Sequence, residues 1–264
     1  DKNFGGDKIL ELKKVFQNSS FEYQTQALVN FAGTDFTNLS QSVSSGDVPS
    51  NAEYYLRLFE AEGTSELSEE YMLAAYPLFK SWVEGNGKSE DNPKTTNGVS
   101  WENRNDILNG SQISWSYTDG AKELALAGDL DRNGITFDEF HVAFGTSVQA
   151  FGGVTGSDFL GGNDGDDKGG VWINRAGYIA SQSFSSEPAD VEMNVTDMVN
   201  KWINGQANNY GMILKFSGSQ ETNSTTYAHL KFFARESQTI FQPKLEVRWD
   251  DHSPCTGSNT GSLT

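Results

Sequence analysis

The sequence is poor in the residues that build most metal and nucleophilic sites. It has one cysteine, Cys255 in a polar tail, and three scattered histidines, His141, His229 and His252. A lone cysteine excludes an internal disulfide framework and a cysteine-based zinc site, and Cys255 has no basic neighbour to activate it. No nucleophile elbow or phosphate-binding loop motif occurs. Some close carboxylate pair is inevitable among 36 acidic residues, but none stands out. We therefore expect no enzymatic activity.

Basic residues are also scarce. The chain has 19 Lys and Arg residues and 36 Asp and Glu residues, which gives a formal net charge of −17. Such a chain repels polyanions, so we expect no nucleic-acid partner, and it suits salty surroundings in which charges are screened. No apolar run approaches the ~20 residues of a membrane helix, so we expect no membrane insertion. The start lacks the order of a signal peptide and predicts a processed product or part of a longer chain.

Length and glycine content favour an all-β protein. The 264 residues suffice for one large all-β domain or two ordinary ones, and 27 glycines against six prolines indicate many tight turns. Segments that alternate with period two predict strands. These are Ile9–Val15, Gln26–Phe31, Tyr54–Ala61, Val171–Ile173, Ile179–Phe184, Asp190–Asn194, Met212–Phe216, His229–Ala234 and Lys244–Trp249.

Helical signals are few. Thr196–Ile203 combines a hydroxyl cap with apolar residues at helical spacing, which predicts a short amphipathic helix with a buried Trp202. Before the middle of the chain, the only convincing short helix is predicted at Lys122–Ala127. Ser65–Pro77 has helical propensity, yet Tyr71–Leu78 also fits a buried strand. Two stretches, Glu84–Asn109 and Gly152–Gly170, predict long loops.

About ten strands with one or two short helices predict a β-sandwich. We expect a single domain over residues 1–250, with an insertion at about 117–150 and a polar tail or linker at 251–264.

Several stretches resemble one family, the DNRLRE-type domains. They are NFGG and QALVNF near the start, YYLRLFEAEG, YPLFKSWVEGNGK and GVSW, and the closing run from VEMNVTDMVNKWINGQ to PKLEVRWDD. The likeness covers about residues 1–116 and 165–251. It implies a jelly-roll-like β-sandwich and a strand at Tyr71–Leu78. The motif that names the family is absent, so the match rests on pattern and order.

The segments YYLRLFEAE, SWVEGNGK, GGVW and LKFFARES are similar in sequence to a subgroup of these domains found in virion structural proteins of marine tailed phages. This resemblance implies a structural component of the tail, neck or a fibre, located in the virion or extracellularly. It also implies partners among copies of the chain or other virion proteins. Bacterial relatives include secreted polysaccharide-binding modules, so the alternative is a carbohydrate-binding module for an extracellular polysaccharide, and a phage adhesin would combine both.

Two acidic loops raise the question of calcium. Asp129, Asp131 and Asn133 begin like an EF-hand loop, but Glu139 falls one residue before the position of the bidentate ligand. The spacing therefore fits a solvated Asn-Gly turn better than a Ca²⁺ site.

The second acidic loop is rich in glycine and contains Asp164, Asp166 and Asp167 beside Asn163. Its oxygen ligands suit Ca²⁺, although a hydrated surface loop is the simpler interpretation. Calcium at these two loops is the only cofactor that the sequence suggests.

Tryptophans are the candidate ligand-binding residues. Trp82 and Trp101 flank the long polar loop and could stack on sugar rings or simply anchor the loop by packing. Trp202 and Trp249 are expected in the core. An anionic polysaccharide would also need a basic patch, which Lys80, Lys88, Lys94 and Arg104 could supply.

Overall fold

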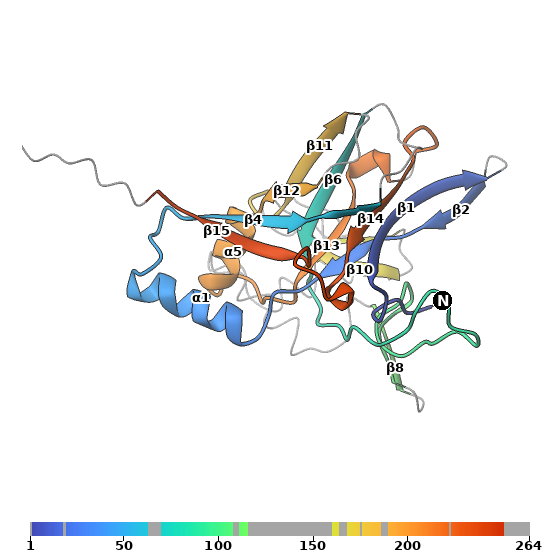
Figure 1. Ribbon diagram of the computed structural model, residues 1–264, viewed down its shortest axis with the longest axis horizontal. Helices are drawn as coiled ribbons and strands as arrows, with labels where there is room; N and C mark the ends of the chain where they lie inside the picture. Colours follow the sequence, from blue (N-terminus) through green and yellow to red (C-terminus); the bar gives the residue numbers. More distant parts are fainter. Residues whose placement is uncertain are drawn as a thin grey trace, which may run out of the picture.

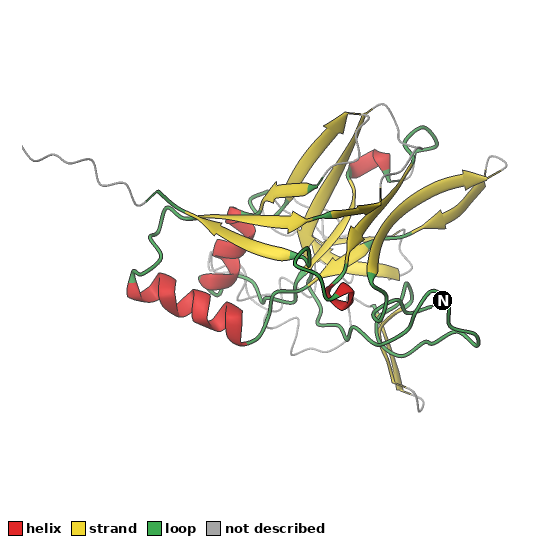
Figure 2. Ribbon diagram, in the orientation of Figure 1, coloured by secondary structure: helices red, strands yellow, loops and turns green. Residues whose placement is uncertain are grey.

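The computed structural model describes residues 2–17, 20–62, 70–107, 111–115, 160–163, 168–174, 176–185, 190–221 and 223–250. Over these ranges it is an all-β structure of antiparallel strands with two α-helices (Figures 1 and 2). The predicted all-β sandwich is thus confirmed, while the jelly-roll connection and the extent of the domain stay predictions.

One sheet has the order β2-β1-β14-β5. Its strands are β1 (Ile9–Gln17), β2 (Ser20–Gln24), β14 (Ala228–Phe233) and β5 (Glu60–Glu62). A second sheet has the order β12-β4-β15 and contains β12 (Val191–Asn194), β4 (Glu53–Leu58) and β15 (Lys244–Arg248). Only Phe59 separates β4 from β5, so one extended run of chain joins the two sheets.

A third sheet has the order β11-β6-β13-β3. Its strands are β11 (Ala180–Ser185), β6 (Glu70–Pro77), β13 (Met212–Phe216) and β3 (Ala27–Val29). Two hairpins complete the β structure, and they are formed by β7 (Asn103–Ile107) with β8 (Ser111–Ser114) and by β9 (Leu160–Asn163) with β10 (Lys168–Ile173).

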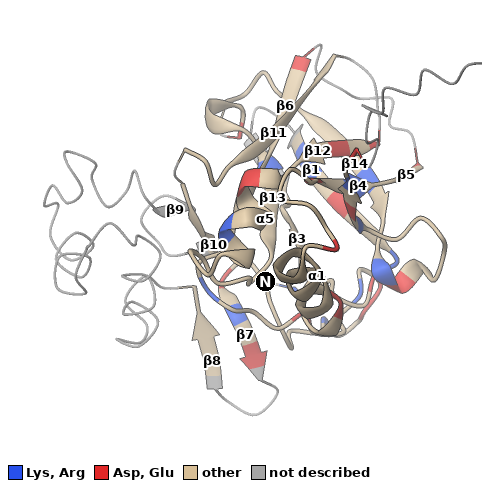
Figure 3. Cartoon of the chain, turned by 90° about the vertical axis from the view of Figure 1, so that its left-hand side faces the viewer, with Lys and Arg blue, Asp and Glu red and all other residues tan. Residues whose placement is uncertain are grey.

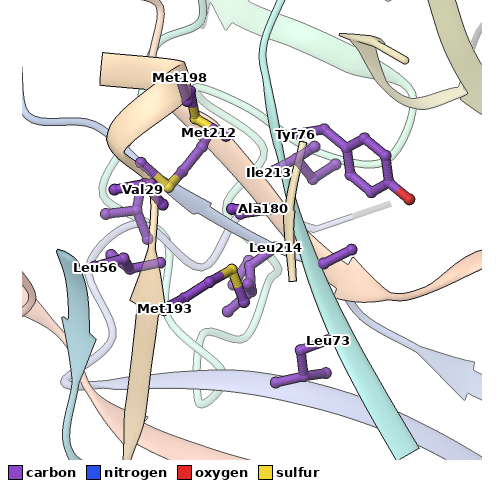
Figure 4. Packing of buried hydrophobic residues seen from close by; sticks show 14 of the residues in the cluster. Val29, Leu56, Leu73, Tyr76, Ala180, Met193, Met198, Met212, Ile213 and Leu214 are labelled. Carbon is purple, nitrogen blue, oxygen red and sulfur yellow. The ribbon is translucent and has the colours of Figure 1, made fainter. Parts of the chain in front are cut away.

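The core lies between the third sheet and the other two. Leu56 and Leu58 of β4, Met193 of β12 and Leu214 of β13 are each 0 % exposed and belong to one apolar cluster. Met193, Met212 and Leu214 gather in this interior, whereas the Tyr76 side chain points away from them (Figure 4). Alternation along β4 and β13 therefore sets which side chains reach the core.

Both helices pack against the end of the sandwich. Helix α5 (Thr196–Ile203) buries Met198, Val199 and Trp202, as its spacing predicts. Helix α1 (Thr34–Ser45) lies beside it, and the Phe36 ring meets the Trp202 ring edge-on at 6.1 Å (Figure 1). The hydroxyl cap predicted for α5 is wrong, because Val195 caps the helix and Thr196 Oγ1 accepts a hydrogen bond from the Tyr54 N–H.

Most strand predictions are confirmed, including the choice of a strand over a helix at Tyr71–Leu78. Four further expectations are wrong. The first half of the chain contains α1, which its Ser- and Thr-rich sequence conceals because these residues have low helix propensity. Both stretches predicted as long loops contain strands: Glu84–Asn109 contains β7, and Gly152–Gly170 contains β9 and the start of β10. Trp249 is 45 % exposed and not in the core, since it follows the last paired residue of β15.

The segment before β1 is held by a fully buried Asn3 side chain. Asn3 Nδ2 donates to the carbonyls of Glu84 and Val99, each at 2.6 Å, and its Oδ1 accepts from the N–H groups of Gly5 and Gly87. Glycines allow this close approach, since a Cβ at Gly87 would strike the Asn3 backbone. The glycines of NFGG and EGNGK are therefore needed for packing between two backbones.

We expect Asn3→Ala to lower the free energy of unfolding by about 2–4 kcal/mol, because it leaves two buried N–H and two buried C=O groups without their partner. The exposed Asn38→Ala on α1 is the matched control and should change stability by less than about 0.5 kcal/mol. Urea denaturation of both variants checks this, and equal small effects would contradict the anchoring role of Asn3.

Candidate functional site

The strongest candidate for a functional surface is the outer face of the β12-β4-β15 sheet. Along β4, Tyr54, Leu56 and Leu58 are buried, so Tyr55 and Arg57 lie on the opposite, outer face. The register places Asn194 and Glu246 on either side of Tyr55, and Glu192 and Lys244 on either side of Arg57. Acidic and basic residues consequently lie close together around these strands (Figure 3).

Four charges on this face form a network, which we call the Arg–Glu ring: Arg57, Glu192, Arg248 and Glu246. It is closed by the ion pair between Arg57 Nε and Glu246 Oε2, 3.9 Å apart. Glu192 accepts from Arg57 and from Arg248, the latter at 2.6 Å, and Arg248 also donates to Glu246 at 3.0 Å. Hydrogen bonds from Arg248 lower the pKa of both Glu192 and Glu246. The ring thereby links the side chains of three adjacent strands.

Arg248 also covers the aromatic ring at the centre of this face. Its guanidinium lies 4.2 Å from the centroid of the Tyr55 ring. The Tyr55 hydroxyl donates to Glu53 at 2.9 Å, and this bond raises the pKa of the tyrosine. The Arg248 guanidinium already occupies the position over Tyr55 that a stacked sugar ring would take. A sugar could therefore stack on this face of Tyr55 only if Arg248 moved.

An aromatic cluster lies at the end of the same face, where β4 passes into β5. Phe241 contacts Phe59 with ring centroids 5.5 Å apart and Phe233 at 5.8 Å. The Lys244 ammonium lies 5.2 Å from the Phe59 ring centroid. Phe241 itself remains 44 % exposed. The sequence does not predict this cluster, because its three rings come from separate segments. The one local signal is the apolar pair Ile240–Phe241 in a turn before Pro243.

A second group of polar residues is buried on the other side of the third sheet. Lys215 on β13 pairs with Glu221, and its ammonium lies 4.0 Å from the Trp172 ring centroid. Glu221 also accepts from Gln24 Nε2 at 2.9 Å and from Gln26 Nε2 at 2.5 Å. Burial lowers the pKa of Lys215, and Glu221 opposes that shift. Because these groups satisfy one another, the cluster ties the chain after β13 to the β2–β3 connection.

Lys14 on β1 is fully buried near this cluster. Its ammonium donates to the Gln220 carbonyl and reaches Asn223 Oδ1 at 3.4 Å. Burial lowers the pKa of Lys14 to about 8, although the charge of Glu221 acts in the opposite direction.

The predicted ligand-binding tryptophans are both half-buried. Trp82 Nε1 donates to the Tyr210 carbonyl at 2.9 Å, and the ring packs against the core. The Trp101 carbonyl accepts from the Gly169 N–H at 2.5 Å, which links it to β10. The Trp82 side chain thus anchors its segment, the Trp101 contact is made by the backbone alone, and ligand binding through either ring stays a prediction.

The prediction of a basic patch is wrong for one of its residues, Lys80, which is 0 % exposed. Another of these residues, Arg104, donates from Nη1 to the Ser81 carbonyl at 3.0 Å. Lys80 follows Phe79 at the end of the buried strand region, so its side chain cannot belong to a surface patch.

The predicted calcium ligands lie outside the described residues. These are Asp129, Asp131, Asn133, Glu139, Asp164, Asp166 and Asp167. In the described part, no group of three or more His, Cys, Asp or Glu side chains has an arrangement that could hold a metal ion. No helix of that part is long and apolar enough to cross a bilayer.

A shallow cavity of about 330 Å³ lies beside the start of α5. Two carboxylates and an amide contribute to its wall together with small apolar groups. The lining residues are Glu53, Ile179, Ala180, Asn194, Val195, Thr196, Asp197 and Met198. The acidic wall would suit a cation or a hydroxylated ligand.

Comparison with protein families, curated proteins and solved structures found no match to this chain.

We expect Glu192→Gln to destabilise the protein at pH 7 and to destabilise it progressively less as the pH falls below 4.5. The folded pKa of Glu192 is lowered, so its contribution is present above the unfolded value near 4.5 and is lost as the pH falls through the folded value. Urea denaturation at a series of pH values from 7 downward checks this. A difference between the variant and the unaltered protein that does not change with pH would show that the ring charges are not its cause.

We expect the free energy of unfolding to rise between pH 7.5 and 9.5. The lowered pKa of Lys14 lets the folded state release a proton there while an unfolded lysine still holds it, so stability increases with pH. Lys14→Met should reduce the rise, and the exposed Lys8→Met is the control. Above pH 10 the raised pKa of Tyr71, about 12, acts in the opposite direction, which sets the upper limit of the measurement. An equal rise in both variants would contradict the assignment.

Proposed function

We propose that this chain is a non-enzymatic structural module of a phage particle, in its tail, neck or a fibre. The observation that carries the proposal is the Arg–Glu ring over Tyr55. The outer face of the β12-β4-β15 sheet is filled by the chain's own charged side chains, and these side chains connect three strands. Such a face favours a rigid, shape-bearing role over an open binding cleft.

Two further features support a rigid module. Asn3 ties the segment before β1 to the backbone of residues 84–99, and Glu221 with Lys215 ties the chain after β13 to Gln24 and Gln26. Both are long-range connections made inside the protein, where hydrogen bonds are shielded from water. A module of this kind can keep its surfaces in fixed positions for repeated contacts in a symmetric assembly.

The likeness of YYLRLFEAE, SWVEGNGK and LKFFARES to virion structural proteins supplies the phage part of the proposal. It supports a location in the virion, with other copies of the chain or other virion proteins as partners. Adhesion of the particle to a host-surface sugar would be compatible with the same role.

The alternative is a secreted carbohydrate-binding module for an extracellular polysaccharide. One observation favours it: Trp249 is 45 % exposed and Phe241 is 44 % exposed, and both lie close in sequence to the cations of Lys244 and Arg248. Exposed rings beside basic groups suit an acidic sugar. Trp101 would then be a second contact, as its position beside the long polar loop predicts.

Immunogold electron microscopy with an antibody against the recombinant chain tests these proposals. We expect labelling at a fixed position on virions from the source culture. Labelling of extracellular matrix with bare virions would overturn the phage proposal and favour the alternative. A pull-down with matrix polysaccharides provides the second arm. Binding that is lost in both Trp249→Ala and Trp101→Ala would support a carbohydrate module, and no binding to any matrix polysaccharide would count against it.

A further inference from the structure

A lysine side chain occupies a core position on β1. Leu12 and Lys14 lie on the buried face of this strand and are both 0 % exposed, while Lys13 between them is partly exposed. The Lys14 ammonium reaches the connection between β13 and β14, where it donates to the Gln220 carbonyl and lies 3.4 Å from Asn223 Oδ1. A buried amine is thus held against the side-chain amide of a residue 209 positions away in the sequence.

The backbone around Asn223 polarises this amide. Asn223 Oδ1 accepts hydrogen bonds from the N–H groups of Thr225, at 3.1 Å, and of Thr226, at 2.8 Å. Because both of these partners are donors, they fix which end of the amide is the oxygen. Asn223 Nδ2 in turn donates to Thr226 Oγ1 at 3.1 Å. Two fixed N–H donors on a carbonyl oxygen stabilise the negative charge that develops there when a nucleophile attacks the carbon.

The surroundings of Lys14 also prepare its amine for attack. Burial lowers the pKa of Lys14 to about 8, so an appreciable fraction of the side chain is the neutral, nucleophilic amine near neutral pH. The negative charge that acts on Lys14 is that of Glu221, which is 4 % exposed and pairs with Lys215. The Glu221 carboxylate can therefore take the proton that the Lys14 ammonium must lose before it attacks.

We propose that Lys14 and Asn223 join in an intramolecular isopeptide bond. Lys14 Nζ attacks Asn223 Cγ, which lies one C=O bond of about 1.2 Å beyond the oxygen that the amine already contacts. The Nζ–Cγ bond forms, the Cγ–Nδ2 bond breaks, and the side-chain nitrogen of Asn223 leaves as ammonia. Glu221 returns its proton to the ammonia. An ammonium ion is consumed and an ammonium ion is released, so the step needs no oxidant, reductant or other co-reactant.

The Thr226 hydroxyl is placed to help the leaving group. In the tetrahedral intermediate, Asn223 Nδ2 is no longer conjugated with the carbonyl and becomes basic, and Thr226 Oγ1 lies beside it. By turning to donate, the hydroxyl passes a proton to this nitrogen before the C–N bond breaks, which is general acid catalysis. The proton that Lys14 Nζ loses as it becomes an amide restores the hydroxyl.

The bond closes most of the chain into one covalent loop. It joins β1 to the connection that follows the short 3-10 helix η1 (Gly218–Gln220), so a pull between the two ends of the chain passes through the new amide and bypasses the residues between. An amide nitrogen does not titrate in the range of an amine. The rise in stability between about pH 7.5 and 9.5 therefore belongs to chains in which Lys14 is still an amine, such as Asn223→Ala.

Mass spectrometry of the purified full chain tests the proposal. We expect a mass about 17 Da below that of the sequence, because one ammonia is lost, and a branched peptide after digestion that joins Lys14 to Asn223. Lys14→Arg keeps the positive charge without the nucleophilic amine, and Asn223→Ala removes the carbonyl, so both should have the full mass. Lys13→Arg, at the next position on β1, is the matched control and should lose ammonia like the unaltered protein.

The branched peptide is the decisive observation, because an asparagine that cyclises to a succinimide also loses ammonia. A full sequence mass after long incubation of the folded chain at about pH 8 would overturn the proposal, and so would a loss that persists in Lys14→Arg. The mass of the unaltered chain decides the question even where a variant fails to fold. None of these results bears on virion labelling by immunogold, so the bond can fail while the proposed phage role stands.

A second pair of variants tests the role of the Thr226 hydroxyl. We expect Thr226→Val to lower the linked fraction at least tenfold at equal times after synthesis, and Thr226→Ser to restore it, because serine keeps the hydroxyl. The same mass measurement checks both, with circular dichroism to show that each variant is folded. Equal linkage in a folded Thr226→Val would show that the leaving nitrogen obtains its proton elsewhere and would overturn this part of the proposal.

Discussion

The passage of β4 through Phe59 into β5 is the constraint on which most of this structure depends. The extended chain from Glu53 to Glu62 is the middle strand of one sheet and the edge of another, so it fixes how the two sheets continue into each other. Its alternation sends Leu56 and Leu58 into the core and Tyr55 and Arg57 outward. Because β14 pairs with β5 and β15 pairs with β4, the chain between β14 and β15 must turn outward beside Phe59. The aromatic cluster of Phe59, Phe233 and Phe241 is a product of that turn.

Charge is distributed in a way that composition does not reveal. The chain has a net charge of −17, yet the outer face of the β12-β4-β15 sheet brings two arginines and two glutamates into one network, with Lys244 beside it. Exposed ion pairs contribute little stability individually, but a network that spans three strands resists shear between them. The same arrangement provides a region where another acidic molecule meets little repulsion.

Buried polar groups show how the sandwich is held without disulfides. Asn3 uses all its donors and acceptors on backbone groups of another segment, and Glu221 gathers Lys215, Gln24 and Gln26. Each set joins segments far apart in sequence. Removing one partner would leave charged or polar atoms buried without compensation, so these positions tolerate little change.

Period-two alternation and apolar spacing determined much of the fold from the sequence alone: the strands at Ile9–Val15, Met212–Phe216 and Lys244–Trp249, and the helix at Thr196–Ile203. Those patterns depend only on which side chains avoid water. Helix α1 could not be predicted, because its stability comes from packing of Phe36 on Trp202 and not from its serine-rich sequence. Arg248 over Tyr55, Lys14 in the interior and the exposed Ile240 were likewise decided by the tertiary structure. They depend on the register between strands and on a turn between them, which bring together residues that no local pattern connects.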